Sequence, residues 1–585
     1  MHMPKRKPFS GSRRGLVVAF DVGTTFSGIS FSVLDPGVVP EIKGVTRFPA
    51  HNPSDFAKIP SVLYYDANGA ARAIGAETQL PGTIEQAENE QWMKVEWFKM
   101  HLRPNSYASN LASKHIPSLP PNKSLIEVLA DFLRYLLSCF KSFIKETVVA
   151  YGPNFWASVQ NHIIFVLSHP NGWEGLQQSY MRQAAVLAGF VSNNINDQDR
   201  IYFVTEGEAS LHFCVNNGLV IGENEGIIVL DAGGGTIDLS AYSSSRSEKG
   251  TTFEEISRSE CCFAGSIFVT EEADLYVQAK LKGSPFYDDV SAIKDVFDRT
   301  TKLQFRSSQE AYFIKFGRPR DNDPALDIRL GQMRIMGSDV ARFFEPSVTA
   351  ALSAIVKQCT YARKTVTSVF LVGGFAASPW LLYKLKDELR PLKLKVYRPD
   401  THVNKAASDG AVSFYLDHFV TKRVSRWPYG IQSVVDYDNN DPEHRRRGYT
   451  LCNLSGRLEV HNLYRVILKK DVQISEEQEF RRSFSRYTAF PVRNVSFDIL
   501  RYKGANENPE WTDVDAGMYT VACTVTADVS RILHTTHRNP GNAFPYYQTR
   551  YDVILLFGLT ELIAQIAWKE EDGVERRCPA QVVYQ

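Results

Sequence analysis

Short runs of apolar residues recur along residues 16–420 and end at small or acidic residues. Four of them are LVVAFDV (16–22), IIFVLS (163–168), GIIVLDA (226–232) and SVFLVGG (368–374). Apolar runs of this length, bounded by turn residues, are typical of buried strands. Stretches with helical spacing lie between them, such as WEGLQQSYMRQAAVLAGF (173–190). Buried strands that alternate with helices predict an α/β fold for this part of the chain.

The longest apolar stretch, residues 125–146, has the spacing of an amphipathic helix. It carries charged residues such as Lys141, and Ser124 and Glu127 form the S-x-x-E pattern of a capping box. No apolar run reaches the roughly 20 residues of a membrane-spanning helix. We therefore expect a helix that packs against a neighbouring element, and no membrane partner.

Beyond residue 428 the pattern changes to strands separated by loops. The predicted strands include GRLEVHNLYRVIL, VSFDILRYK, MYTVACTVTADVS, RYDVILLFG and LIAQIAW. Residues 430–585 contain no stretch that predicts a long helix. The sequence therefore predicts an all-β, sandwich-like domain over residues 428–585, joined to the α/β domain through a short segment near residues 419–428.

One sequence motif, called a phrase below, occurs twice, and both copies follow an apolar run. FDVGTTFSG occupies residues 20–28, and LDAGGGTID occupies residues 230–238. In each copy a buried strand ends at an aspartate, and a turn rich in glycine and threonine follows; these turn residues are Gly23, Thr24, Thr25, Gly233, Gly234, Gly235 and Thr236. Glycine lets the backbone approach a ligand closely, and a turn that directs successive N–H groups into one concavity binds anions.

The aspartates of the two phrases call for a cation. Asp21 and Asp231 would repel a phosphate held by the neighbouring turn, unless a cation lies between them. Mg²⁺ fits because it bridges carboxylates to phosphate oxygens and keeps several waters. Two such turns predict a duplicated domain whose halves close on one polyphosphate. A third strand, in LVGGFAAS (371–378), ends at Gly373 and Gly374, where backbone could pack against an adenosine.

Charge and cysteine content narrow the function classes. The 585 residues contain 66 Lys and Arg against 65 Asp and Glu, so nothing indicates a nucleic-acid partner. Basic residues gather at the start, where residues 1–15 are expected to form a flexible tail, with a nuclear address as the alternative. The eight cysteines have no CxxC spacing, which favours reduced thiols and a cytoplasmic location.

Taken together, these phrases resemble the seventy-kilodalton heat-shock chaperone family of the actin-like ATPase superfamily. DVGTTFSG and LDAGGGTIDLS are similar to its two phosphate motifs, and LVGGFAASPWL is similar to its adenosine motif. FVTEGEASLHF (203–213) and SDGAVSFYL (408–416) are similar to its two connecting motifs. The residues of these motifs are most similar to those of a divergent branch of the family found in animals and fungi. The resemblance implies a duplicated, ribonuclease-H-like two-lobe domain over residues 16–420.

The resemblance also implies roles for individual residues. Asp21, Asp231 and Glu206 would surround magnesium and its waters, and Asp238 would help to order the water shell. The turn residues named above would hold the phosphates of ATP or ADP. Lys99 would be the lysine near the γ-phosphate, with Lys94 as the alternative register. Lys99, Glu206 and Asp231 are therefore the expected catalytic residues, and Lys302, Gly373 and Gly374 would contact the nucleoside.

Several positions depart from the family pattern. Phe375 and Ala377 stand where the adenosine motif usually carries serine and arginine, and Leu303 replaces an arginine that stacks on the base. These changes predict adenine contacts that are fewer or rebuilt. The linker usually rich in Leu and Asp reads FVTKRVSRWPYG instead, and because the sequence stops at Gln585 we expect no helical lid.

The expected function is a slowly hydrolysing, ATP-binding chaperone or chaperone-like regulator. Its partners would be polypeptide clients or a folded protein, with a co-chaperone or exchange factor. One alternative is a scaffold that senses nucleotide with little or no turnover. The other is a small-molecule kinase, since one fold hosts many functions; such a kinase needs a carboxylate base facing a substrate hydroxyl, and the sequence does not place one.

Overall fold

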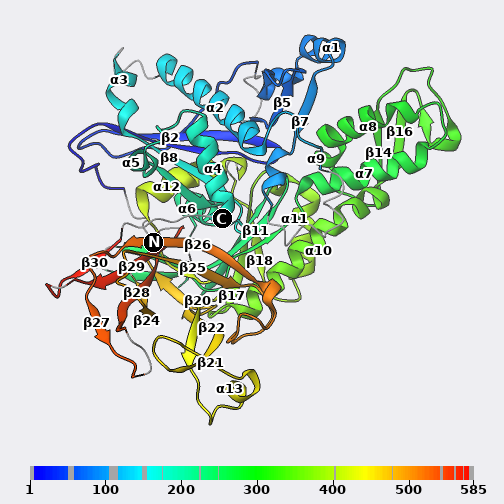
Figure 1. The fold of residues 1–585 in the computed structure, drawn as a ribbon. Coiled ribbons are helices and arrows are strands. Elements are labelled where there is room, and N and C mark those ends of the chain that lie inside the picture. Colours follow the sequence, from blue (N-terminus) through cyan, green and yellow to red (C-terminus); the bar gives the residue numbers. More distant parts are fainter. Residues whose placement is uncertain are drawn as a thin grey trace. The chain divides into compact units, whose positions relative to one another are not determined.

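A computed structural model describes most of the chain. It describes residues 6–50, 58–103, 116–147, 154–173, 175–219, 221–222, 225–247, 250–400, 403–476, 478–540, 544–558, 561–570 and 572–578. The chain divides into two compact units, Met1–Val420 and Thr421–Gln585. The mixed α/β class predicted for the first part is confirmed by the strands and helices of Met1–Val420 (Figure 1).

The first sheet of Met1–Val420 is built around an antiparallel hairpin. Its strands follow the order β3-β2-β1-β8-β9, and β4 also pairs with β2. The bounds are β1 (Gly15–Asp21), β2 (Phe26–Leu34), β3 (Lys43–Gly44), β4 (Ile59–Pro60), β8 (Ile163–His169) and β9 (Ile201–Thr205). β1 is antiparallel to β2 and parallel to β8, and β8 is parallel to β9.

The second sheet repeats the first. Its strands follow the order β12-β11-β10-β17-β18, and β13 also pairs with β11. The bounds are β10 (Gly226–Ala232), β11 (Ile237–Ser247), β12 (Gly250–Glu255), β13 (Glu260–Cys262), β17 (Val366–Val372) and β18 (Lys395–Tyr397). β10 is antiparallel to β11 and parallel to β17, and β17 is parallel to β18. The two sheets therefore share the same strand order and strand directions.

Each sheet has its own hydrophobic core. In the first, Phe20 of β1 packs against Phe140, Phe165 and Phe190 with ring centroids 6.5, 6.4 and 4.7 Å away. Phe140 belongs to α2 (Leu125–Thr147), which confirms the predicted amphipathic helix. The Ser124 N–H donates to Glu127, and the Glu127 N–H donates back to Ser124 Oγ, so the capping box is confirmed too.

The remaining elements of Met1–Val420 surround these cores. The other helices are α1 (Pro81–Asn89), α3 (Phe155–Val159), α4 (Gly175–Leu187), α5 (Ile195–Gln198), α6 (Glu206–Asn216), α7 (Ser266–Leu281), α8 (Val290–Val296), α9 (Lys302–Gln304), α10 (Gly337–Tyr361), α11 (Pro379–Leu389) and α12 (Ala406–Asp417). Two small sheets contain β5 (Val62–Tyr65), β6 (Ala71–Ile74) and β7 (Met93–Glu96), and β14 (Ala311–Lys315), β15 (Ile328–Arg329) and β16 (Gln332–Met336). No helix in the described part of the chain is both long and apolar enough to cross a membrane.

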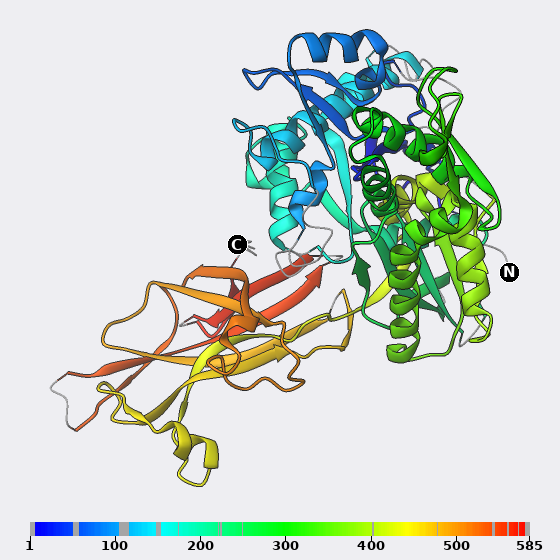
Figure 2. The ribbon, with the colours of Figure 1, turned by 90° about the vertical axis from the view of Figure 1, so that its right-hand side faces the viewer.

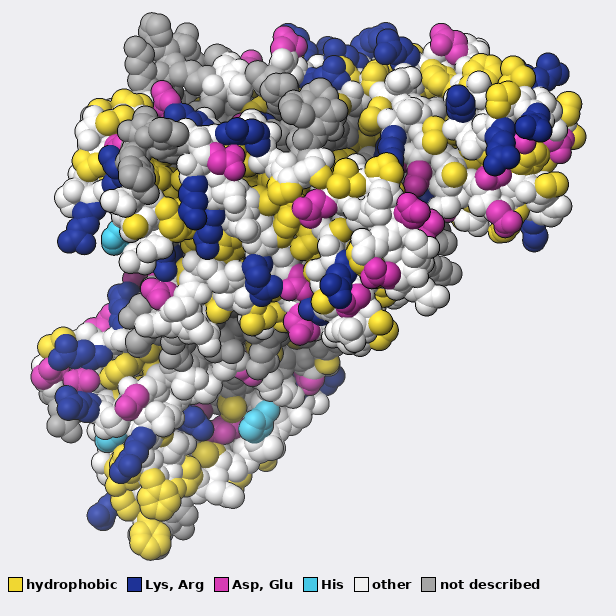
Figure 3. Space-filling model, turned by 90° about the horizontal axis from the view of Figure 1, so that it is seen from above, with side chains coloured by type: hydrophobic (Ala, Val, Ile, Leu, Met, Phe, Trp, Pro, Cys, Tyr) yellow, Lys and Arg dark blue, Asp and Glu magenta, His cyan; other side chains and the backbone are white. Residues whose placement is uncertain are grey.

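The start of the chain contacts α12. Both guanidinium nitrogens that Arg6 directs at Asp417 lie 2.8 Å from its carboxylate oxygens. The backbone of Phe9 pairs with that of Gly37 and Val38. Residues 1–5 of the predicted basic tail lie outside the described residues. On the face of the molecule in Figure 3, basic and acidic side chains are interspersed, as the balanced composition predicts.

Two helices exchange places between the two sheets. α6 follows β9 of the first sheet, keeps contacts with β8 and β9, and packs more extensively against β10 and β11 of the second sheet, whereas α12 follows the second sheet and packs against β1, β2 and β8 of the first. The helices cross at Ala209 and Gly410, both fully or nearly fully buried. A Cβ at Gly410 would collide with the carbonyl oxygen of Ala209. The crossing therefore requires a residue without a side chain, and it fixes one sheet relative to the other.

Thr421–Gln585 consists almost entirely of strands (Figure 2). One sheet has the order β21-β22-β20-β25-β26, and the other has the order β24-β28-β29-β30 with β27 beside β28. The bounds are β20 (Tyr429–Asp436), β21 (Thr450–Leu451), β22 (Leu458–Leu468), β24 (Glu479–Thr488), β25 (Asn494–Tyr502), β26 (Tyr519–Asp528), β27 (His534–His537), β28 (Tyr546–Gly558), β29 (Glu561–Lys569) and β30 (Glu575–Arg577). β19 (Val420–Val424) pairs with β23 (Gln473–Ser475), and α13 (Pro442–Arg447) is a short helix.

Substitution of Gly410 tests the helix crossing. Gly410→Ala should lower the free energy of unfolding by about 3 kcal/mol, the upper range for overpacking a core, because the new methyl group meets backbone. Gly82→Ala in α1 is the matched control, since a Cβ there meets no atom within 4 Å and should raise stability by about 0.5 kcal/mol. Urea unfolding followed by tryptophan fluorescence measures both. Equal unfolding midpoints for Gly410→Ala and the wild type would contradict the crossing.

Candidate functional site

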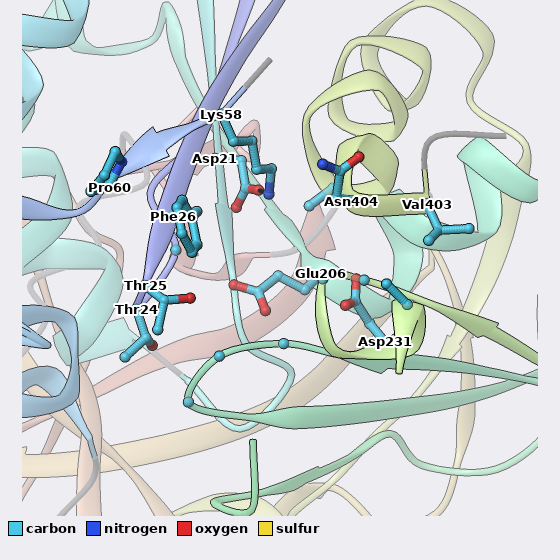
Figure 4. Close-up of a pocket in the computed structure, with 18 of the residues that line it drawn as sticks. Asp21, Thr24, Thr25, Phe26, Lys58, Pro60, Glu206, Asp231, Val403 and Asn404 are labelled. Carbon is cyan, nitrogen blue, oxygen red and sulfur yellow. Dashed lines mark hydrogen bonds and ion pairs between the residues drawn. The ribbon is translucent and has the colours of Figure 1, made fainter. Parts of the chain in front are cut away.

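A cavity of about 900 Å³ lies in Met1–Val420 where the two hairpins meet. This volume is at the upper end of the range for small-molecule sites, roughly 300–1,000 Å³. Its lining includes the turn between β1 and β2, the turn between β10 and β11, and the glycines that follow β17. The three phrases singled out in the sequence therefore line one space (Figure 4).

The second turn is held by the first residues of α7. The N–H groups of Ser266, Ile267 and Gly265 donate to the carbonyls of Gly233, Gly234 and Gly235, at 3.1, 2.9 and 3.2 Å. A trans peptide directs its N–H opposite to its C=O, and the described chain contains no cis bond. The N–H groups of Gly234, Gly235 and Thr236 consequently point away from α7, and these residues line the cavity. Three successive N–H groups with one orientation make an anion-binding turn.

Glycine is required where β17 ends. Gly373 has a φ of +93°, and a Cβ there would collide with Asp231 and with the backbone of Ala232. Gly374 lines the cavity as well, but a Cβ there would meet no atom within 4 Å. The first glycine therefore lets β17 end against the aspartate of β10, and the second leaves room in the cavity.

Two lysines form ion pairs with two of the buried carboxylates. Lys58 Nζ is 2.6 Å from Asp21 Oδ2, and Ser168 Oγ donates to Asp21 Oδ1 at 3.0 Å. Lys99 Nζ is 2.6 Å from Glu206 Oε1 and 5.3 Å from the centre of the Trp173 ring. Glu206 begins α6, where the Thr205 side chain caps the helix by accepting from the Glu208 N–H. An acidic residue in the first helical turn is favoured by the helix dipole.

The ion pairs shift the pKa values of Asp21 and Lys99. Burial alone would raise the pKa of Asp21, but Lys58 and Lys99 outweigh burial and hold that pKa below its usual value. Burial would likewise lower the pKa of Lys99, yet Glu206 and Asp21 outweigh it and raise that pKa. Asp21 and Lys99 are therefore charged at neutral pH.

Among the described residues, no lysine forms an ion pair with Asp231 or Asp238. Asp231 accepts a 2.5 Å hydrogen bond from Ser210 Oγ, and Asp238 Oδ1 accepts from the backbone N–H of Asn171 at 2.7 Å. Burial and the charge of Glu206 raise the pKa of Asp231 to about 7, and the same two causes raise the pKa of Asp238 above neutrality. Four carboxylates thus share two lysines, and the site has a deficit of positive charge.

Most residues predicted for the site are brought together by the fold. The lining contains Asp21, Gly23, Thr24, Thr25, Lys99, Glu206, Asp231, Gly233, Gly234, Gly235, Thr236, Gly373 and Gly374. Asp238 lies behind the second turn, fully buried on the Asn171 backbone. Lys302 is placed differently from the expectation: its ammonium pairs with Asp298 and is 3.0 Å from Thr270 Oγ1. Its neighbour Leu303 lines the cavity instead.

Several residues that line the cavity belong to none of the sequence motifs. Lys58, Arg398 and Asn404 line the cavity, and Figure 4 shows Lys58 beside Asp21, with Asn404 to their right. The Arg398 guanidinium donates to the carbonyls of Ala376 and Ala377 at 3.1 and 3.3 Å, and Ala377 is a position where the family pattern has an arginine. Lys58 and Arg398 belong to no motif and approach the site only through folding, so no local signal identifies them.

The donor set fits magnesium that arrives with a nucleotide. Within the described residues, no three carboxylate, imidazole or thiol groups converge as a complete metal cage. Mg²⁺ rarely needs one, because it keeps waters and uses one or two carboxylates together with substrate phosphates. The carboxylates of Asp231 and Glu206, which line the cavity, suit such a water-bridged ion, and the N–H groups of the turn suit the phosphates.

The comparisons with known proteins find only weak similarities. No protein-family model matches the chain. Heat shock 70 kDa protein 12B of Homo sapiens is 27% identical over 218 residues, which cover 36% of this chain and 29% of that protein. Heat shock 70 kDa protein 12A of Mus musculus is 24% identical over 507 residues, which cover 72% of each. The chain thus has distant similarity to members of the heat-shock 70 kDa family, at the level of the family alone.

The pH dependence of stability tests the charge deficit. The folded pKa of Asp231, about 7, exceeds the ordinary 3.8, so the folded state holds a proton that the unfolded chain has already lost. That stabilisation is complete below about pH 4 and disappears as pH rises through 7. In buffer with a chelator, the thermal midpoint should fall by a few degrees between pH 6 and pH 9. The thermal midpoint of Asp231→Asn should fall less over the same pH range. Equal falls in the thermal midpoints of the two proteins would contradict a raised pKa for Asp231.

Proposed function

We propose that Met1–Val420 binds ATP or ADP with Mg²⁺ and hydrolyses ATP slowly, as an actin-like ATPase domain of the heat-shock 70 kDa type. The observation that carries this proposal is the convergence of two glycine- and threonine-rich turns, from two sheets of equal topology, on one cavity whose lining includes Asp21, Glu206 and Asp231. The distant similarity to two heat-shock 70 kDa proteins supports a nucleotide ligand. The limits of the domain, residues 16–420, are part of the proposal.

Each part of the cavity has a separate task in this proposal. The N–H groups of Gly234, Gly235 and Thr236, with the hydroxyls of Thr24 and Thr25, bind the phosphates. Asp21, Glu206 and Asp231 would hold Mg²⁺ through its waters, and the ion would neutralise charge that develops on the transferred phosphoryl group. Lys99, buried against Glu206, adds a second positive charge near that group. Phosphoryl transfer needs mainly such positioning and electrostatic stabilisation.

Glu206 is proposed to orient the attacking water. Its Oε1 accepts from Lys99 Nζ at 2.6 Å, which fixes the rotamer of the side chain. The second oxygen remains the acceptor for a proton of the water. Arg398 and Leu303 are proposed to face the base, because both line the cavity and the guanidinium is held by the carbonyls after β17. Arg398 would then replace the cation missing at Ala377.

Thr421–Gln585 is proposed to bind a polypeptide client or a folded protein partner. The support is its composition of two β-sheets whose outer strands, such as β26, offer backbone groups for strand addition. A co-chaperone or exchange factor for the ATPase domain is part of the same proposal. All eight cysteines are free thiols, which favours the cytoplasm, with the nucleus as the alternative.

Gly374→Val tests the nucleotide site with the fold intact. The new side chain would extend into the cavity, where a Cβ meets no atom within 4 Å, so it should occupy space that the nucleotide needs. Titration calorimetry with ATP and Mg²⁺ should show affinity reduced by at least about tenfold, or roughly 1.4 kcal/mol. Gly82→Val is the control, because it adds the same side chain in open space outside the cavity. Undiminished affinity in Gly374→Val would remove the site assignment.

Glu206→Gln tests turnover separately from binding. The amide keeps the shape of the side chain but loses its charge, and single-turnover hydrolysis should slow by roughly 100-fold, or about 2.7 kcal/mol of barrier. Affinity for ATP should remain within a few-fold of the wild type. Glu96→Gln is the matched control, since Glu96 forms a similar 2.8 Å ion pair with Lys94 outside the cavity. Wild-type turnover no faster than in buffer would instead favour a scaffold that senses nucleotide.

A further inference from the structure

Lys58 is a cation of the cavity that the family resemblance does not assign. It immediately precedes β4, and its side chain is 13% exposed. The cavity lining contains Lys58, Lys99 and Arg398 as its cations among the described residues. The Arg398 guanidinium is held by two backbone carbonyls and the Lys99 ammonium by Glu206. The role of Lys58 therefore has to be argued from its own contacts.

The backbone of Lys58 is anchored beside the first phosphate turn. β4 pairs with the start of β2 through Ser27↔Ile59 and Phe26↔Pro60. The Ser61 N–H donates to the Thr25 carbonyl at 2.8 Å, and Ser61 Oγ donates to the Gly23 carbonyl at 2.8 Å. These bonds hold the origin of the Lys58 side chain next to the turn of Thr24 and Thr25, while the four-carbon chain beyond it retains its rotatable bonds.

Lys58 and Lys99 differ in how firmly their ammonium groups are held. Lys99 is 4% exposed and lies between Glu206 and the Trp173 ring. Lys58 is more exposed and has its ammonium on Asp21 Oδ2. Figure 4 shows both the Lys58 and Asp21 side chains at the cavity wall. The Lys58 ammonium can therefore move into the cavity without rearrangement of the core, which the Lys99 ammonium cannot do.

Lys58 occupies a carboxylate that the proposed function needs for another cation. Both carboxylate oxygens of Asp21 accept hydrogen bonds. Oδ1 accepts from Ser168 Oγ, and Oδ2 accepts from Lys58 Nζ. An ammonium 2.6 Å from one oxygen repels a divalent ion that approaches the same carboxylate. Lys58 and Mg²⁺, with or without its waters, therefore compete for Asp21.

We propose that Lys58 is a phosphate-binding residue that the free protein stores on Asp21 and transfers to the nucleotide phosphates when nucleotide and Mg²⁺ enter. The inference rests on the proposed nucleotide binding. The exchange replaces one ion pair by another: the ammonium leaves a carboxylate with one charge for a triphosphate with several, and the metal side of the site gains Asp21. Lysine suits this role because its ammonium is a compact point charge that binds phosphate without a fixed geometry.

Removal of Lys58 should have two opposite effects. Lys58→Met loses a charge from the phosphates, so affinity for ATP should fall by about tenfold, while affinity for adenosine stays unchanged. The same substitution frees Asp21, so Mn²⁺ alone, a paramagnetic stand-in for Mg²⁺, should bind several-fold more tightly in the absence of nucleotide. A lysine with only a structural role would move all three affinities in the same direction.

The experiment uses the full chain at pH 8. Titration calorimetry measures ATP with Mg²⁺ and adenosine, and electron paramagnetic resonance measures free Mn²⁺. Lys58→Arg keeps the charge and should retain ATP affinity within about threefold. Lys94→Met is the matched control, because Lys94 pairs with Glu96 at 2.8 Å and does not line the cavity; it should change none of the affinities. Near-ultraviolet circular dichroism checks that each variant is folded, and Lys58→Gln repeats the test if Lys58→Met is not.

The outcomes separate this inference from the proposed function. If the wild type binds no ATP, the proposed function fails and the role of Lys58 fails with it. If the wild type binds ATP and Lys58→Met binds it equally well, only the role of Lys58 is overturned. Equal losses for ATP and adenosine, or Mn²⁺ affinity that is unchanged or weaker, would likewise overturn the transfer from Asp21 and leave nucleotide binding standing.

Discussion

A shortage of positive charge around four buried carboxylates governs the arrangement of this site. Asp21 and Asp231 end the first strand of each sheet, Glu206 begins α6, and Asp238 follows the second turn. Buried carboxylates are costly unless they are paired or bonded. Two of the four carboxylates form ion pairs with lysines. Asp231 is not one of these two, and burial together with the charge of Glu206 raises its pKa. The strand ends, the capped start of α6 and the flanking lysines are therefore parts of one charge balance.

That balance depends on how the two sheets are joined. α6 and α12 each leave one sheet and pack against the other, so the carboxylates of both sheets are held at one place. The helices can come this close because Ala209 faces Gly410, where a methyl group would collide with backbone. The same geometry lets Lys99 reach Glu206, although 107 residues separate them in the chain. The two sheets carry similar turns, and the packing of α6 against α12 holds both turns at one cavity.

Much of the fold was predictable because its signals are local. Residues 16–22 and 226–232 are apolar runs that end at an aspartate, and both are strands in the structure. The periodicity of residues 125–146, with Ser124 and Glu127 ahead of it, predicted α2 and its cap. Lys302 was placed by motif analogy, and its contacts could not be predicted. In the structure Asp298, one helical turn earlier, pairs with its ammonium, and Lys302 is not among the described residues that line the cavity.

The sequence by itself determined the composition of each turn, the strands that carry them and the identity of the acidic residues. These follow from patterns within about ten residues, where backbone geometry and hydrophobic spacing act directly. Tertiary structure alone decided which cations meet those acids. Lys58 and Arg398 approach the cavity from β4 and from the end of β18, through pairings that no local pattern encodes. The raised pKa of Asp231 and the ion pair of Lys58 with Asp21 exist only after folding, because burial and ion pairing depend on contacts between residues distant in the sequence.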